Sequence, residues 1–173
     1  MEQDKCKVCG RDAEFYSPYL KQHLCKKHFE RMIIRRVSKV VTSAGLKSRG
    51  YRLKDDGSEA FRLIKFMFKE DKNSKVALLN YTMEDFAVEV LKYFISRNYK
   101  TKIKVEAPGR LNPLYTTSEA EISEFIGAKR MKHSKRRRPA GDQKLLEFIK
   151  GFEERRPGGM ISMVKMGREI GVI

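Results

Sequence analysis

Cys6-Lys-Val-Cys9 and Cys25-Lys-Lys-His28 together contain all three cysteines of this 173-residue chain. A C-x2-C pair followed by a C-x2-H pair is the spacing of a tetrahedral zinc site, in which each pair supplies two ligands from a tight turn. Four protein ligands leave no open coordination position, so no metal-bound water remains to be activated. The sequence therefore predicts one structural Zn2+ bound by Cys6, Cys9, Cys25 and His28.

An alternative interpretation of the same stretch is three reduced thiols beside a surface histidine, because free cysteine often serves as a small buried apolar residue. The odd number of cysteines argues against a disulfide framework. His23 and His133 lie outside the spacing and are expected to be ordinary polar residues. The paired spacing favours a metal site over free thiols.

The charge of the chain is strongly unbalanced, with 38 lysines and arginines against 22 acidic residues and a formal net charge of +16. The excess lies at the two ends: residues 1–53 carry +8, residues 54–107 carry +2 and residues 108–173 carry +6. A charge run is most often a solvated surface, and adaptation to heat also enriches charged residues, but heat adaptation raises both signs together. The dominance of one sign indicates a polyanionic partner, and nucleic acid is the expected one.

Neither a membrane span nor a secretion signal is expected. No stretch reaches the ~20 apolar residues of a spanning helix, and Met-Glu-Gln-Asp-Lys at the N-terminus contains no apolar signal core. The length suits one domain, or one domain with a small appendage. The sequence thus predicts a cytoplasmic protein without a membrane partner.

Residues 29–43 have the periodicity of an amphipathic helix that ends at Ala44-Gly45. Arg31, Arg35 and Lys39 recur every four residues, which places three cations along one exposed stripe. Such a stripe suits a phosphate backbone, although a merely solvated helix face is an equally good interpretation.

The middle of the chain has the pattern of an α/β unit. Residues 76–81 form a short continuous apolar run, typical of a strand covered on both faces in a parallel sheet. Thr82 and Asp85 have the spacing of a capping box, which opens a helix to about residue 97 with Phe94 facing inward. Residues 101–106 alternate apolar side chains with lysines and are predicted to form a second strand. Strand, helix and strand make one βαβ unit.

A helix is also predicted near residues 58–69, capped by Asp56 and with its aromatic residues in the core. Residues 107–117 contain two prolines and a glycine and are predicted to be a linker. Ser118 begins a further capped helix.

That helix runs into residues 129–138, here called the basic strip, where seven of ten positions are basic. Such a run repels itself unless an anion neutralises it. A last helix is predicted over residues 142–156, with Phe152 facing inward. The tail over residues 160–173 shows no clear period.

The segments from Cys6-x-x-Cys9-Gly10 through Leu24-Cys25-x-x-His28-Phe29 to Arg35-Arg36-Val37 resemble the start of TtuA-type tRNA 2-thiolation enzymes. Asn112-Pro-Leu114 with Ser118-Glu-Ala-Glu121, and Leu146 to Gly158, resemble the closing helices of that family. The resemblance spans most of the chain and is most specific at the metal motif. It implies a PP-loop-like body and tRNA as a partner.

Members of that family bind ATP at a glycine-rich SGGxDS loop, and the corresponding place here reads Lys54-Asp-Asp-Gly-Ser-Glu59. Carboxylates beside a polyphosphate repel it. The family also uses cysteines at its reactive centre, commonly holding an iron–sulfur cluster, and this chain has no cysteine after Cys25. We therefore expect neither ATP nor an iron–sulfur cluster, and the resemblance carries over no catalytic residue.

The expected fold class is α/β, in four parts. These are a small zinc-binding module (residues 1–28), a basic helix and loop (29–53), a truncated PP-loop-like (Rossmann-like) α/β body (54–106), and a linker with the basic strip and C-terminal helices (107–173).

The predicted function is that of a non-catalytic, zinc-containing RNA-binding protein. Its partner is expected to be structured RNA, either tRNA or ribosomal RNA on a ribosomal subunit, held through phosphate contacts. Tyr16, Tyr19 and Tyr115 lie in predicted loops and are candidates for stacking on bases, although loop tyrosines more often pack at an edge. The candidate RNA contacts are cations of the basic helix, its loop and the basic strip: Lys26, Lys27, Arg31, Arg35, Arg36, Lys39, Lys47, Arg49, Lys129, Arg130, Lys132, Lys135, Arg136, Arg137 and Arg138.

Two other functions stay open. The chain could be an accessory subunit that presents tRNA to an active thiolation enzyme. It could also be a DNA-binding zinc-finger regulator, which is less favoured because nothing between Cys25 and His28 builds the recognition helix of a ββα finger.

Overall fold

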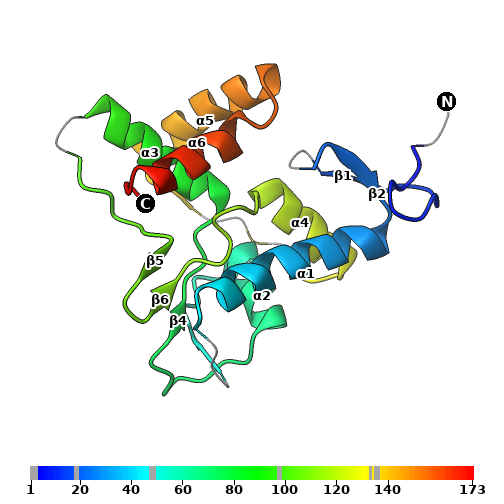
Figure 1. Cartoon of the computed structure of the whole chain (residues 1–173), viewed down its shortest axis with the longest axis horizontal. Helices are drawn as coiled ribbons and strands as arrows, with labels where there is room; N and C mark the ends of the chain where they lie inside the picture. The colour runs from blue at the N-terminus through cyan, green and yellow to red at the C-terminus, as the bar shows by residue number, and fades with distance from the viewer. Residues whose placement is uncertain (1–3, 18–19, 47–49, 97–98, 133, 135–136) are drawn as a thin grey trace.

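The computed structural model describes residues 4–17, 20–46, 50–96, 99–132, 134 and 137–173 (Figure 1). A small antiparallel hairpin and a long helix precede a four-stranded sheet with helices around it. In chain order the elements are β1 (Phe15–Ser17), β2 (Gln22–Leu24), α1 (Lys26–Ser43), β3 (Arg52–Leu53), α2 (Glu59–Met67), β4 (Ala77–Leu78), α3 (Met83–Ile95), β5 (Glu106–Ala107), β6 (Arg110–Leu111), α4 (Glu119–Ala128), α5 (Ala140–Arg155) and α6 (Gly159–Glu169).

The body is organised by two consecutive βαβ units. The strand order is β3-β4-β6-β5, in which β3, β4 and β6 run parallel and β5 pairs antiparallel with β6. Helix α2 connects β3 to β4, and α3 lies in the connection from β4 to β6. The predicted mixed α/β fold with a Rossmann-like body is therefore confirmed, and β3 is a parallel strand that the sequence pattern did not reveal.

The predicted second strand was placed too early in the chain. The parallel partner of β4 is β6, which lies inside the segment expected to be a linker. Gly109, with φ of +67°, turns the chain between β5 and β6, and a Cβ there would come within 2.9 Å of the Lys75 carbonyl oxygen. Residues 101–105 pack without pairing in the sheet, and the Lys102 N–H donates instead to the Glu89 carboxylate at 2.7 Å. The alternation of apolar residues there reflects burial against a core, not strand pairing.

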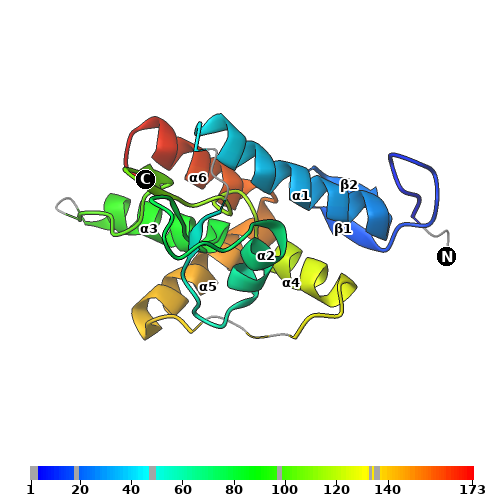
Figure 2. The same ribbon diagram turned by 90° about the horizontal axis from the view of Figure 1, so that it is seen from below.

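Two hydrophobic cores hold the helices. One is built by α1, α2 and α4 with the sheet and includes Phe29, Ile33 and Phe125. The other is built by α3, α5 and α6 (Figures 1 and 2). Helix α6 approaches α3 closely at Gly167, where a Cβ would come within 2.3 Å of Val90 Cγ2. The tail that showed no period is thus a packed helix.

The helix starts follow the expected chemistry with one exception. Helices α3 and α4 both begin with capping boxes. Helix α2 is capped by Ser58, whose hydroxyl accepts from the Phe61 N–H at 3.2 Å, and not by Asp56. Asp56 instead accepts from the Ser58 hydroxyl at 2.6 Å and from the Asn80 amide at 2.7 Å. Asp56 therefore ties the loop before α2 to the loop after β4.

Three aromatic residues that were expected in the core are exposed: Phe66 (48%), Phe94 (53%) and Phe152 (37%). Phe66 lies edge-on to Phe125 with ring centroids 5.6 Å apart. Each of the three lies on a helix that has more apolar residues than positions facing the core, so some of these residues remain exposed. In the part of the chain that the structure describes, no helix combines the length and apolarity needed to cross a membrane.

Candidate metal centre and basic surfaces

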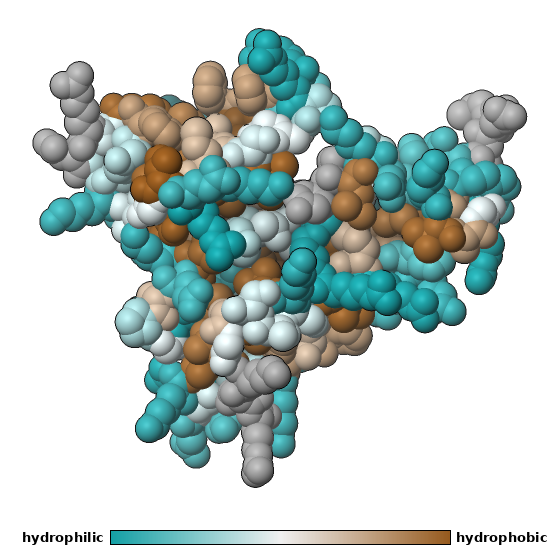
Figure 3. All heavy atoms as spheres, viewed as in Figure 1, coloured by the Kyte–Doolittle hydropathy of each residue, from teal (hydrophilic) through white to brown (hydrophobic). Residues whose placement is uncertain are grey.

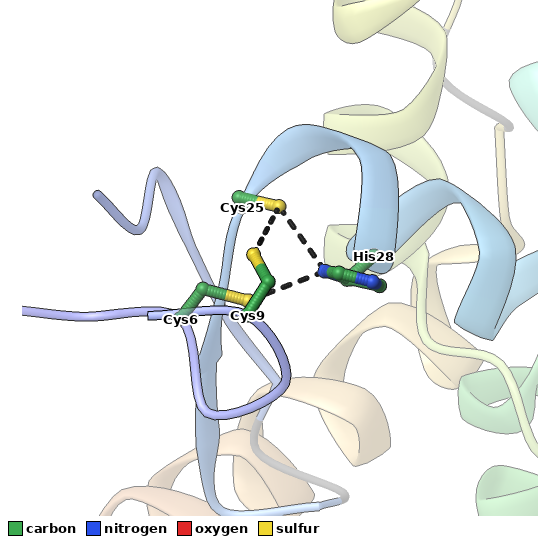
Figure 4. A group of neighbouring side chains, drawn as sticks. All are labelled: Cys6, Cys9, Cys25 and His28. Carbon is green, nitrogen blue, oxygen red and sulfur yellow. Dashed lines mark hydrogen bonds between the residues drawn. The ribbon is translucent and has the colours of Figure 1, made fainter. Parts of the chain in front are cut away.

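The first ligand pair lies on a tight turn before β1. The Gly10 N–H donates to the Cys6 carbonyl oxygen at 2.8 Å, and the Cys6 N–H donates to the Arg11 carbonyl oxygen at 2.7 Å. Gly10 has a φ of +70°, which a residue with a side chain rarely adopts. The turn directs the thiols of Cys6 and Cys9 toward the same point (Figure 4).

The second pair lies at the start of α1. Cys25 is the N-cap residue with extended backbone, and its carbonyl oxygen accepts from the His28 N–H at 3.0 Å. Residues three apart at a helix start lie on the same side, so Cys25 and His28 both face the first turn (Figure 4). The β1–β2 hairpin, with Phe15 opposite Leu24, brings the two pairs together.

The four donor atoms form a compact group and all lie within 4.8 Å of one another. His28 Nδ1 lies 3.5 Å from Cys6 Sγ and 3.4 Å from Cys25 Sγ, and Cys9 Sγ lies 3.8 Å from Cys25 Sγ. Metal–sulfur bonds of ~2.3 Å and a metal–nitrogen bond of ~2.0 Å in a tetrahedron give edges of about 3.5–3.8 Å. The spacing therefore fits a closed tetrahedral centre.

The thiols of the centre differ in acidity. Burial alone would raise the pKa of Cys6, but backbone hydrogen bonds from Cys25, Val8 and Cys9 and a hydrogen bond with His28 outweigh it and lower this pKa to about 6. A backbone hydrogen bond from Arg11 lowers the pKa of Cys9, yet burial and the two neighbouring thiols raise it above the ordinary value. A bound cation would favour the ionised form of its thiol ligands.

The metal centre is continuous with the hydrophobic core. Cys6 and Cys25 are buried and belong to the same core as Phe29. The Phe15 ring stacks on Phe29 with centroids 4.6 Å apart. The N-terminal module therefore fixes the beginning of α1 against the body.

A row of cations runs along the outer side of α1 and is here called the α1 basic face: Lys27, Arg31, Arg35 and Lys39. All four are exposed and spaced four residues apart. In Figure 3, hydrophilic side chains lie on the surface over α1. Among the described residues none of the four has an acidic group within salt-bridge distance. Lys26 is exposed beside this row.

Three of the cations that were expected to contact RNA are engaged inside the protein. Arg36 Nη1 lies 2.7 Å from the Glu121 carboxylate and also donates to the Thr116 carbonyl oxygen. Lys129 Nζ lies 2.7 Å from the Glu30 carboxylate.

Arg138, the third of these, has a side chain only 7% exposed and is paired with Asp85 at 2.8 Å and with Glu119. Burial alone would lower the pKa of Arg138, but the two carboxylates outweigh it and raise this pKa. Because a buried ion pair loses several kcal/mol when one partner is removed, Arg36 and Arg138 stabilise the fold, whereas Lys129 forms a partly buried pair.

The remaining cations of the basic strip divide into two groups. Arg130, Lys132 and Arg137 are exposed. Lys135 and Arg136, like Lys47 and Arg49 of the loop after α1, lie outside the described residues. The Lys129–Glu30 ion pair places the beginning of the strip beside α1.

A cavity of about 400 Å3 lies at the carboxyl ends of the parallel strands, where the helices that follow them begin. It is bordered by Ser58 at the start of α2, Thr82 at the start of α3 and Glu119 at the start of α4, with Lys150 of α5 opposite. This is where α/β sheets bind ligands. The sequence analysis did not identify Lys150 as a candidate site residue. The loops that connect strands to helices were the signal in the sequence for this edge of the sheet.

Glu84 lies next to this cavity's wall and is 4% exposed. Its Oε1 accepts from the Glu119 N–H at 2.8 Å, while its Oε2 has no hydrogen-bond partner among the described residues. Burial and then the charge of Glu119 raise the pKa of Glu84 to about 7. The folded protein therefore holds a proton here that the unfolded chain releases at a lower pH.

The Glu84→Gln variant should remove this pH dependence. The raised pKa means that stability is present at low pH and falls as the pH rises from about 4.5 to about 7. The glutamine side chain resembles the protonated carboxyl, so the variant should gain about 1–3 kcal/mol over the wild type at pH 8 and match it at pH 4. Urea unfolding at the two pH values measures this difference.

Glu124→Gln on the exposed side of α4 is the matched control and should show the same small change at both pH values. If both variants changed the free energy of unfolding at pH 8 by the same amount, this result would contradict the raised pKa of Glu84.

Comparison with known proteins gives a family match for the N-terminal module and matches in fold for the whole chain. Residues 5–30 match the family model described as the N-terminal LIM domain of the 2-thiouridine synthetase TtuA. The solved structure of the U34-tRNA thiolase NcsA from Methanococcus maripaludis with its 4Fe-4S cluster matches with a TM-score of 0.80 at 12% identity, covering 98% of this chain and 89% of that chain. At this identity the second likeness shows a shared fold. No curated protein matches the chain.

These matches correct the cofactor prediction. A single structural zinc ion with neither ATP nor an iron–sulfur cluster was expected, but the thiolase with the same fold carries a 4Fe-4S cluster and the cysteine-rich module is of the TtuA type. Thiolate-rich tetrahedral donor sets accommodate zinc and iron–sulfur centres alike, so the spacing of Cys6, Cys9, Cys25 and His28 indicates a metal site without selecting the metal.

The N-terminal module and the body are each similar to a known protein. A segment that matches the TtuA N-terminal LIM domain over residues 5–30 precedes a Rossmann-like body with the same fold as the NcsA structure.

Proposed function

We propose that this protein binds structured RNA, with tRNA as its partner, and that it catalyses no reaction on its own. The cations of the α1 basic face contact phosphates, and the metal bound by Cys6, Cys9, Cys25 and His28 fixes the helix that carries them. The thiolase match concerns a tRNA enzyme and supports tRNA as the partner. A ribosomal subunit has no comparable support. A tRNA partner would be met in the cytoplasm.

The observation that carries this proposal is the α1 basic face itself. Four exposed cations, none with an acidic group within salt-bridge distance among the described residues, span about 18 Å along the helix, since α-helices rise 1.5 Å per residue. Unpaired cations in a row repel one another, and this repulsion falls when phosphates replace their counterions. The formal charge of +16 supports the same partner at the level of the whole chain.

The absence of thiols outside the N-terminal module supports a non-catalytic role. All three cysteines belong to the candidate metal centre, which leaves no further thiolate in this chain to carry sulfur. Formation of thiolated tRNA by the purified protein, supplied with ATP and sulfide, would contradict this part of the proposal.

A binding competition tests the RNA partner. The purified protein is mixed with fluorescently labelled tRNA, and unlabelled tRNA or duplex DNA of equal phosphate content is added. We expect tRNA to displace the probe at a concentration at least about tenfold lower than duplex DNA does, because the partner is a folded RNA whose 2′-hydroxyls and unpaired loops DNA lacks. Equal displacement would favour a DNA-binding regulator.

A role as an accessory subunit is the second candidate. It is favoured by the combination of a thiolase fold with cysteines confined to the N-terminal module. In that case the protein would co-purify with an active thiolase and its loss would lower tRNA thiolation in cells. Binding to tRNA alone with no associated thiolase would argue against it.

A further inference from the structure

A second basic feature lies on the opposite end of α1 from the metal centre. A cleft of about 310 Å3 is formed between the C-terminal half of α1, the β5–β6 hairpin, the loop after β6 and the end of α6. Figure 2 shows α6 beside α1 in this region. The cleft, here called the α1–α6 cleft, is lined by Arg36, Lys39, Glu106, Tyr115 and Arg168 among others.

Arg168 and Tyr115 form a preassembled pair in the cleft. Arg168 Nη1 donates to the Tyr115 hydroxyl at 2.7 Å, and the guanidinium carbon lies 5.3 Å from the centre of the tyrosine ring. Phe86 lies edge-on to the same ring with centroids 6.3 Å apart and supports it from the core. Arg168 is exposed, so a planar cation is held in place while still reachable from outside.

The charges of the cleft are arranged asymmetrically. Lys39, the last cation of the α1 basic face, is exposed at one side and has no ion pair with any described residue. Arg36 is already neutralised by Glu121 and forms part of the wall. Glu106 is exposed and would repel a phosphate, so an anionic group belongs on the side of Lys39 and a hydrogen-bond donor on the side of Glu106.

We propose that the α1–α6 cleft binds one unstacked nucleotide of the RNA, an inference that rests on the proposed function. The base stacks on the Arg168 guanidinium, its phosphate contacts Lys39, and a base amine or ribose hydroxyl donates to Glu106. Guanidinium planes and aromatic rings are the surfaces on which splayed RNA bases stack. The volume of the cleft suits a single nucleotide, and a base inside a duplex could not reach it.

Replacement of Arg168 tests the stacking contact. Arg168→Ala should weaken binding of labelled tRNA about tenfold, because one stacked base is lost. Arg168→Lys keeps the charge but not the plane and should remain weakened. Arg155→Ala on the exposed side of α5 removes one positive charge elsewhere and should bind like the wild type. Wild-type affinity of Arg168→Ala, or full recovery with lysine, would overturn the stacked nucleotide.

Ultraviolet cross-linking gives a second measurement that does not depend on the folding of a variant. Irradiation of the wild-type complex with tRNA should yield a cross-linked peptide that contains Tyr115. Cross-links confined to peptides outside the cleft would overturn the inference. Failure of the wild type to bind tRNA at all would instead overturn the proposed function, so the two failures are distinct.

Discussion

Removal of the metal should unfold the N-terminal module while leaving the body folded. In the Cys6→Ser/Cys9→Ser variant, we expect the metal bound per chain to fall from the wild-type content to near zero. Amide hydrogen exchange of residues 5–17 and 20–24 should accelerate by at least about 100-fold, because the free energy of metal binding in such modules is folding free energy. Elemental analysis and exchange mass spectrometry measure the two effects, and elemental analysis also identifies the metal.

Apart from its packing against the first core through Phe15 and Leu24, the module is held together by little else. Its hairpin pairs only three residues of β1 with three of β2, and it has no disulfide within the described residues. The body has its own two cores, so slow exchange in α3 and α6 should persist in the variant.

The two histidines near this module provide a matched control. His28 points Nδ1 at the sulfurs of Cys6 and Cys25, whereas His23 lies 3.3 Å from the Asp4 carboxylate and packs against Tyr16. His28→Gln should lose most of the metal, and His23→Gln should retain it. Equal metal content in the two variants would remove His28 from the ligand set.

Charge reversal on the α1 basic face should abolish most RNA binding. The triple variant Lys27→Glu, Arg31→Glu, Arg35→Glu should lower the affinity for tRNA by on the order of 100-fold at ~0.1 M salt, because three phosphate contacts and their released counterions are lost. These side chains are exposed, so the thermal midpoint should change little. Fluorescence anisotropy with labelled tRNA measures the affinity.

A second triple variant separates location from net charge. Lys144→Glu, Arg155→Glu and Arg156→Glu change exposed cations of α5 and its C-terminal end, away from α1, and lower the formal charge by the same amount. It should retain affinity within about threefold, since long-range effects are screened beyond ~10 Å at this ionic strength. An equal loss in both variants would mean that overall charge, and no particular face, attracts the RNA.

The metal centre could be predicted from sequence because its geometry is local. The two ligands of each pair are close neighbours in the chain, and the turn at Gly10 and the first turn of α1 follow from that spacing. The identity of the metal is not encoded by the spacing, since the same donor set serves several ions. The start of α4 at Ser118 was also predictable, because a capping box depends on residues that are close together in the chain.

The basic strip shows where sequence patterns fail. Arg138 belongs to a run of cations that has every mark of a solvated surface, yet it pairs with Asp85, which is 53 residues away, and with Glu119. Arg36 likewise pairs with Glu121, 85 residues away. Such pairs depend on the approach of α3, α4 and α1 in space, and nothing in the run itself reveals them. Free cations can be told from internal ones only after the fold is known.

The strands of the body were only partly predictable for a related reason. β3, β4 and β6 are two residues each, too short to show a period. The apolar run at β4 was visible because its residues are continuous in the chain, whereas β6 was hidden beside Gly109 and the prolines around it. The α1–α6 cleft joins residues that lie far apart in the chain. Arg36, Lys39 and Tyr115 were candidates in the sequence, but nothing there brought them together with Arg168.

The salt dependence of tRNA binding by the wild-type protein tests the central claim most directly. Four phosphate contacts from the α1 basic face predict that the logarithm of the association constant falls with the logarithm of the salt concentration with a slope of about −3 to −4. A slope near zero between ~50 and ~300 mM salt, with tRNA still bound, would contradict a contact surface made of cations and phosphates.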